Sequence, residues 1–217
     1  MSRLSSPVRV TERGPRAMAI PQWPAEFAYS TTVPLDRSPA AHTDAGQRAA
    51  IHALARAGCS IAELPPRTGR RPAWPAGFTG SIAHDDALAI AVVARSDAAT
   101  CLGIDVERYD ALSVRDARVV LHDDELDFAD DDPALATLIW SAKESAYKAW
   151  CTGVDIDLER VDPRDIRIAV PRADTFHARA TGALADRVAS IGALHGRWMR
   201  VDALVITLAW RVGGPKG

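Results

Sequence analysis

Two short segments carry acidic and basic side chains at spacings suited to phosphate chemistry. Asp105 and Glu107 lie two residues apart in CLGIDVE, and Glu144 and Lys148 lie four apart in WSAKESAYKAW. If CLGIDVE is a strand, its two carboxylates share one face about 7 Å apart. Neighbouring carboxylates repel unless a cation neutralises them, and their oxygens suit Mg²⁺. The pair therefore predicts a magnesium site; the polar face of an ordinary edge strand is the alternative.

The use of lysine singles out the second segment. Of the 26 basic side chains, 23 are Arg and only three are Lys, and two of these, Lys143 and Lys148, flank Glu144. Lysine presents a compact point charge and arginine a planar fork, so a site for a single phosphate oxygen can prefer lysine. Chance on a solvated helix face is the alternative.

Helical periodicity gives residues 134–151 two different faces. Trp140, Glu144, Tyr147 and Lys148 lie close together, opposite the apolar stripe. A face that is half aromatic and half ionic is typical of a cleft wall, where Glu144 would add a third carboxylate to the first pair. An i,i+4 salt bridge beside two exposed aromatics is the alternative. The stripe expected to face the core comprises Leu135, Leu138, Ile139, Ala142, Ala146 and Ala149.

The segment GFTGSIAHDD, interpreted as a loop, offers further phosphate contacts. Its glycines allow close backbone approach, and Ser81 and His84 can donate hydrogen bonds to phosphate oxygens. Arg70 and Arg71 lie just upstream and favour an anion there. A lone histidine is more often structural than functional, which is the alternative for His84.

Short strands and helices are expected around these residues. A helix should begin near Thr43, with Thr43 or Asp44 as N-cap, and end just before Gly58. Residues 21–34 indicate irregular chain or an edge strand, and residues 87–95 and 100–106 an antiparallel hairpin. The boundary between the two halves of the fold is expected near residues 96–104. Further elements are expected as helices at 113–120, 123–129 and 133–151 and strands at 166–170, 176–180, 197–201 and 203–211. The predicted fold class is α+β, with two similar halves that each combine a small antiparallel sheet with packed helices.

Amino-acid composition indicates the class of protein and where it is found. The chain has 217 residues, 47% hydrophobic and 25% charged, as in a globular protein. No apolar run reaches membrane-spanning length and no signal layout begins the chain, so we expect a cytoplasmic protein without a membrane partner. Its three cysteines, which are far apart, argue against a disulfide framework or a zinc site.

Charge is unevenly distributed along the chain. Residues 1–71 hold ten Arg against five acids, and residues 97–132 hold three Arg against twelve acids. Such a split suits an anionic ligand met partly through a divalent metal, although two solvated faces would produce it too. No basic arm interleaved with aromatics is present, so nucleic acid is not an expected partner.

Three segments together resemble the 4′-phosphopantetheinyl transferase superfamily: GSIAH (80–84), GIDVE (103–107) and WSAKESAYKAW (140–150). PAWPAG (72–77) and HGRW (195–198) resemble its enterobactin-synthase component D and surfactin-type branch. The resemblance implies a monomeric enzyme with two halves related by a pseudo-twofold axis. That enzyme would transfer the 4′-phosphopantetheine arm of coenzyme A to a serine of an apo acyl, aryl or peptidyl carrier protein, releasing 3′,5′-ADP.

The same resemblance assigns the catalytic residues. Asp105, Glu107 and Glu144 match the ligands of Mg²⁺, with Mn²⁺ as the alternative ion. Glu144 also matches the base toward the serine hydroxyl, and Lys148 matches the lysine that contacts the coenzyme A pyrophosphate. The implied catalytic set is therefore Glu144, Lys148 and Asp105.

Coenzyme A, the co-substrate, would also be bound by the first half of the chain. His84 matches a histidine near the 3′-phosphate and Arg48 an arginine of the coenzyme A-binding helix, while Arg70, Arg71 and Ser81 are further candidates. Ala83 stands where the family often has a serine, and Ala40 where it often has a second arginine.

The implied organisation is a flexible tail at 1–20, a coenzyme A-binding half at 21–102 and a metal-binding, catalytic half at 103–217. By analogy, carrier proteins would dock on residues 112–126.

Two other functions fit part of the pattern. A Mg²⁺-dependent nuclease or phosphodiesterase usually carries Glu-x-Lys on a strand, whereas here Lys precedes Glu in a helical pattern. A non-catalytic carrier-binding homologue would be expected to lack one of the three metal ligands.

Overall fold

A computed structural model gives the structure of the protein and describes residues 23–66, 71–154, 161–172 and 174–212. The predicted tail at 1–20 and Arg70 lie outside the described residues. In chain order the elements are β1 (Ala28–Thr32), α1 (Pro39–Arg56), β2 (Phe78–His84), β3 (Ala89–Arg95), β4 (Ala99–Arg108), α2 (Val114–Val120), α3 (Asp123–Ala129), α4 (Pro133–Gly153), a 3₁₀ turn η1 (Pro163–Asp165), β5 (Ile166–Arg172), β6 (Thr175–Ala180), α5 (Gly182–Arg187), β7 (Leu194–Val201) and β8 (Leu204–Val212).

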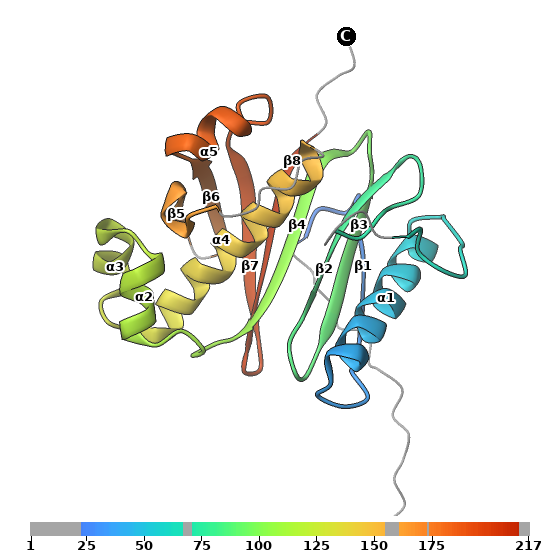
Figure 1. Ribbon diagram of the computed structural model, residues 1–217, viewed down its shortest axis with the longest axis horizontal. Coiled ribbons are helices and arrows are strands. Elements are labelled where there is room, and N and C mark those ends of the chain that lie inside the picture. Colours follow the sequence, from blue (N-terminus) through green and yellow to red (C-terminus); the bar gives the residue numbers. More distant parts are fainter. Residues whose placement is uncertain (1–22, 67–70, 155–160, 173, 213–217) are drawn as a thin grey trace, which may run out of the picture.

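The strands form two antiparallel sheets, which confirms the predicted α+β class. The first sheet has the order β1-β3-β2 and the second the order β4-β8-β7-β6-β5. In Figure 1, α1 lies against the first sheet and α4 runs along β4 across the second. Each helix buries an apolar side against its sheet, and a third cluster of buried side chains joins the first sheet to the outer face of β4.

Helix α1 begins earlier than predicted. Pro39 occupies its first turn, and the Ser38 side chain accepts a hydrogen bond from the Ala41 amide, so Ser38 is the N-cap rather than Thr43 or Asp44. Serine followed by proline is a strong helix start, because it satisfies a free amide and fixes φ for the first turn. The predicted end is confirmed, with Gly58 at φ +86 just beyond it.

Helix α4 has the predicted bounds and the predicted core face. Pro133 begins it, the Asp132 side chain caps the Ala134 amide, and Gly153 ends it. Its apolar stripe is buried against the second sheet, apart from the half-buried Leu135. None of the helices in the described part of the chain combines the length and apolarity needed to cross a membrane.

The predicted hairpin between residues 87–95 and 100–106 is wrong. β3 lies between β1 and β2, whereas β4 pairs with β8 in the other sheet. The connection at Arg95–Ala98 is a tight turn, but long-range pairing with β8 decides where β4 goes. The proposed division between residues 102 and 103 falls inside β4 and remains a proposal.

Glycine at position 103 allows α4 to approach β4 closely. A Cβ atom there would overlap the Ser145 carbonyl oxygen and the Ala149 amide nitrogen. Because both are backbone atoms of α4, they cannot move aside without moving the helix. Gly103 therefore sets the spacing between the strand that carries Asp105 and the helix that carries Glu144.

Candidate active site

Asp105 on β4 points toward α4 and is held by two of its side chains. Lys148 Nζ lies 2.7 Å from Asp105 Oδ1, and the Ser141 hydroxyl donates to Oδ2 at 2.9 Å. Asp105 is buried, while Lys148 is partly exposed. The predicted strand face is thereby confirmed, because Leu102 and Ile104 pack on the opposite side in the cluster between the sheets.

Glu107 and Glu144 extend the same negative region. Burial, followed by the charge of Asp105, raises the pKa of Glu107 to about 7; Lys148 and a hydrogen bond with Trp140 oppose the rise. Burial and Asp105 also raise the pKa of Glu144, against the effect of Lys148. The three carboxylates therefore lie close enough to affect one another's ionisation.

Lys148 is the cation of this group. Burial alone would lower its pKa, but the attraction of Asp105, the hydrogen bond between them and the charges of both glutamates raise it overall. Lys148 thus carries a full positive charge beside three acids. Trp140, Glu144, Tyr147 and Lys148 are half-buried, unlike the buried stripe on the core face of α4, and their role as a cleft wall stays a prediction.

The donor set suits Mg²⁺ in its chemistry but is not arranged as a closed metal cage. Within the described ranges, no three His, Cys, Asp or Glu side chains converge closely enough to hold a metal ion by themselves. Three carboxyl groups nevertheless lie beside one ammonium group in a partly buried place, so a bound cation would favour the ionised form of all three. Mg²⁺ commonly binds through one or two carboxylates, with waters and substrate phosphates completing its shell, and these residues fit that use.

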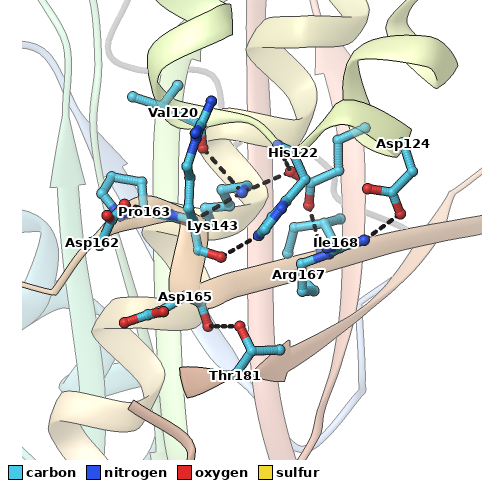
Figure 2. Close-up of polar contacts among 12 residues, drawn as sticks. Val120, His122, Asp124, Lys143, Asp162, Pro163, Asp165, Arg167, Ile168 and Thr181 are labelled. Atoms are coloured by element: carbon cyan, nitrogen blue, oxygen red, sulfur yellow. Dashed lines mark hydrogen bonds and ion pairs between the residues drawn. The ribbon is translucent and has the colours of Figure 1, made fainter. Parts of the chain in front are cut away.

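Lys143 has different partners from Lys148, although it lines a cavity of about 150 Å³ together with Glu144 and Tyr147. Figure 2 shows the Lys143 ammonium group near Val120 of α2 and Pro163 of η1, where it pairs with Glu125 and donates to the carbonyls of Val120 and Pro163 at 3.1 and 3.0 Å. Burial lowers the pKa of Lys143, and the charge of Glu125 opposes that shift. Of the two lysines that flank Glu144, only Lys148 belongs to the carboxylate group.

Arg48 lies at a separate cavity on the α1 side. It forms an ion pair with Asp44, one helical turn earlier, and donates to the Val33 carbonyl at 3.4 Å. The cavity, about 630 Å³, is lined by α1, residues 62–66, Pro72 and Ile82. Its size and its arginine suit part of a nucleotide-like ligand.

Ser81 and His84 do not converge, because their segment is strand β2 rather than a loop. On a strand, positions 81 and 84 face opposite sides. Ser81 is buried on the side of the cluster between the sheets, whereas His84 is exposed on the α1 side, its ring centroid 5.2 Å from that of His42. The structure therefore favours His84 over Ser81 as a contact for a ligand lying along α1.

Arg71 bridges the two halves of the chain. It donates to the Cys151 carbonyl near the end of α4 at 2.6 Å and lines a cavity of about 570 Å³ with Trp74 and Thr152. This cavity is not the one at Arg48, although Pro72 lines both. Arg71 is thus held in place by the end of α4.

Sequence reasoning missed two hydroxyl residues of the site, Ser141 and Thr207. Ser141 could have been found, since it is a small polar residue three positions before Glu144 on a helix that packs on the Asp105 strand. Thr207 could not, because only the pairing of β4 with β8 places it opposite Asp105.

Comparison with known proteins places this geometry in a family. A model described as the 4′-phosphopantetheinyl transferase superfamily matches residues 101–209, and one for the N-terminal domain of these transferases matches residues 44–94. The chain belongs to the 4′-phosphopantetheinyl transferase superfamily. Like other members, this transferase moves 4′-phosphopantetheine from coenzyme A to apo carrier proteins. The nuclease and the non-catalytic alternatives are not supported by these matches.

Individual relatives cover different shares of the chain. The 4′-phosphopantetheinyl transferase Svp of Streptomyces mobaraensis is 34% identical over 185 residues, which span 78% of this chain and 72% of Svp. Enterobactin synthase component D of Salmonella typhi is 35% identical over 124 residues, 52% of this chain and 48% of its own length. Among solved structures, the acyl carrier protein synthase AcpS of Mycobacterium tuberculosis aligns with a TM-score of 0.44 at 20% identity, over 54% of this chain and 99% of its own.

Proposed function

We propose that this transferase uses Glu144, Lys148 and Asp105 to move phosphopantetheine onto a serine of an acyl, aryl or peptidyl carrier protein. One observation carries the assignment. The Lys148–Asp105 ion pair of 2.7 Å lies beside Glu107 and Glu144, on two elements that pack directly against each other. This arrangement combines a cation for phosphate oxygens with carboxylates that can take up a proton or hold a metal.

Asp105, Glu107 and Glu144 would hold Mg²⁺, or Mn²⁺ in its place. When bound, the ion would supply charge neutralisation for the coenzyme A pyrophosphate. The raised pKa values of Glu107 and Glu144 support the assignment, because they show that Lys148 alone does not offset the burial and mutual repulsion of the acids.

The transfer itself requires one proton acceptor and one phosphate-binding cation. The serine oxygen forms a bond to the β-phosphorus of coenzyme A, and the bond from that phosphorus to the bridging oxygen breaks, which releases 3′,5′-ADP. The serine proton passes to the Glu144 carboxylate. Lys148 hydrogen-bonds to the pyrophosphate oxygens and stabilises the charge that develops on the leaving group.

Coenzyme A binding would extend over the first sheet. Arg48 and His84 lie on the α1 side of β2, where they would meet the 3′-phosphate, and the 630 Å³ cavity beside Arg48 offers room for the adenosine portion. Arg71, fixed against the end of α4, is the further candidate for a phosphate contact. Ser81 is the weakest member of the predicted set because it is buried on the opposite face of β2.

The carrier protein would dock on α2. Val119 is 69% exposed there, and Arg115 and Arg118 belong to the same helix. Exposed apolar and basic side chains suit a partner with an acidic surface around its serine. The neighbouring α3 exposes Asp123, Asp124 and Asp127, which would repel such a partner, so α2 is the better part of the predicted 112–126 segment.

Mass spectrometry of a panel of apo carrier proteins tests the function. Incubation with the transferase, coenzyme A and Mg²⁺ should add one phosphopantetheine to the serine of at least one acyl, aryl or peptidyl carrier and release 3′,5′-ADP. Glu144→Gln should remove this activity and leave the melting temperature within a few degrees of the parent. Absence of a mass gain on every carrier would overturn the proposal, and normal turnover by Glu144→Gln would exclude Glu144 as the base.

A further inference from the structure

The fully buried hydroxyls of Ser141 and Thr207 lie next to Asp105. The Ser141 hydroxyl is 2.9 Å from Asp105 Oδ2 and 2.9 Å from the Thr207 hydroxyl. Thr207 also donates to the backbone carbonyl of Ser141 at 2.8 Å. These contacts form a short chain from β8 through α4 to the carboxylate on β4.

The Ser141 hydroxyl is the donor in its contact with Asp105. Each hydroxyl has one proton to donate, and an ionised carboxylate only accepts. Thr207 donates its one proton to the Ser141 carbonyl, and its oxygen also lies 2.9 Å from the Ser141 hydroxyl oxygen. The Ser141 proton is then free for Asp105 Oδ2, and donating it to Thr207 instead would leave that buried oxygen without this donor.

The chain fixes the carboxylate relative to both neighbouring elements. Asp105 and Thr207 are directly opposite each other in the β4–β8 pairing, and Ser141 lies on α4 three residues before Glu144. Oδ2 is held by Ser141 and Oδ1 by Lys148, so rotation of the carboxylate about its χ2 angle breaks at least one contact.

We propose that Ser141 and Thr207 are positioning residues that hold the Asp105 carboxylate in the orientation needed for cation binding. The inference rests on the proposed role of Asp105 as a metal ligand. Without the Ser141 hydroxyl, the carboxylate can turn both oxygens toward Lys148 and away from an incoming ion. Hydrogen bonds from residues behind a ligand typically change metal affinity 10- to 100-fold.

Mn²⁺ binding, followed by the electron paramagnetic resonance of the free ion in the presence of coenzyme A, tests the role separately from turnover. Ser141→Ala should weaken Mn²⁺ binding roughly 10-fold or more. Thr207→Val should weaken it less, and Thr207→Ser, which keeps the hydroxyl, should restore it.

Ser145→Ala is the matched control. Ser145 is fully buried on the same helix, but its hydroxyl returns to the Ala142 carbonyl at 3.0 Å. The control should bind Mn²⁺ like the parent. Equal Mn²⁺ affinities for Ser141→Ala, Thr207→Val and Ser145→Ala would overturn the inference, and Thr207→Val keeps the test open if Ser141→Ala fails to fold.

Asp105→Asn separates the inference from the function on which it rests. If Asp105→Asn loses Mn²⁺ affinity and both hydroxyl variants keep it, only the positioning role is wrong. If Asp105→Asn also binds Mn²⁺ like the parent, Asp105 is not a ligand, and the metal assignment and the positioning role both fail.

Discussion

The Lys143 ammonium lies 2.7 Å from Glu125 Oε2, and the two side chains are only 1% and 2% exposed. Glu125 also accepts a hydrogen bond from the Ile168 amide at 2.8 Å, while Lys143 donates to the carbonyls of Val120 and Pro163. The pair thereby joins α4 to α2, α3, η1 and β5 (Figure 2). It anchors the proposed carrier-docking helix to the helix that carries Glu144.

Lys143→Met should destabilise the protein by about 3 kcal/mol or more, because it leaves the Glu125 charge buried without a counter-ion. Urea unfolding measures the change. Adding Glu125→Gln should recover part of the loss by removing that charge. Parental stability in Lys143→Met would show that the pair contributes nothing to the fold.

Lys148→Met should reduce activity much more than stability, the reverse of what we expect for Lys143→Met. Lys148 is 29% exposed, and Asp105 keeps its hydrogen bond from Ser141, so we expect a smaller loss of stability than in Lys143→Met. The rate of carrier modification at saturating coenzyme A should fall roughly 10²- to 10³-fold, the usual effect of removing one group that stabilises transition-state charge. A decrease below about threefold would exclude Lys148 from the pyrophosphate contact.

Mg²⁺ should raise the melting temperature, because an ion that binds only the folded protein stabilises it, by about 2.7 kcal/mol at a hundredfold excess over its Kd. Chelation with EDTA should reverse the shift and abolish turnover. Glu107→Gln should reduce the Mg²⁺-dependent shift. Asp110→Asn, at a carboxylate that is 72% exposed, is the control and should leave it unchanged; equal shifts in both variants would exclude Glu107 as a ligand.

Gly103→Ala should destabilise the protein and reduce turnover, because the added methyl would overlap the backbone of α4 at Ser145 and Ala149. Gly46→Ala is a useful comparison. Its methyl would lie 2.8 Å from Ile82 Cγ2, the end of a flexible side chain that can move. Thermal unfolding should therefore show the larger loss for Gly103→Ala, and a larger loss for Gly46→Ala would contradict the proposed packing role.

Cys101 should make stability fall in alkaline solution. Burial raises the pKa of this thiol to about 11. Between its ordinary pKa and that value the folded state keeps a proton that the unfolded state has lost, so stability decreases as pH rises. The decrease should be roughly 1 kcal/mol between about pH 8 and about pH 10. Urea titrations at both pH values should show this component in the parent and not in Cys101→Ala.

Local patterns were enough to predict much of the second half. The 3.6-residue period of α4 separates its buried stripe from the face of Glu144 and Lys148, and strand alternation places Asp105 and Glu107 together. Both predictions depend on residues within one element. For the same reason the helices at α2 and α3 and the strands β5 to β8 were found close to their observed bounds.

β2 was predicted as a loop because its glycine-rich sequence lacks the apolar alternation of a strand. In the structure its hydrogen bonds to β3 over Phe78–His84 compensate for the weak local preference. The error had a consequence for the site, since a loop can bring Ser81 and His84 to one ligand and a strand cannot. Intrinsic strand propensity predicts a strand poorly when pairing with a neighbouring strand determines whether it forms.

The sequence by itself determined the α+β class, the two faces of α4, the carboxylates of β4 and the resemblance to the superfamily. Only the tertiary structure decided that β4 pairs with β8, that Thr207 therefore lies opposite Asp105, and that Lys143 pairs with Glu125 whereas Lys148 pairs with Asp105. The physical reason is that periodicity within a segment shows which side chains share a face. Which distant segment packs against that face depends on burial and hydrogen bonding summed over the whole chain.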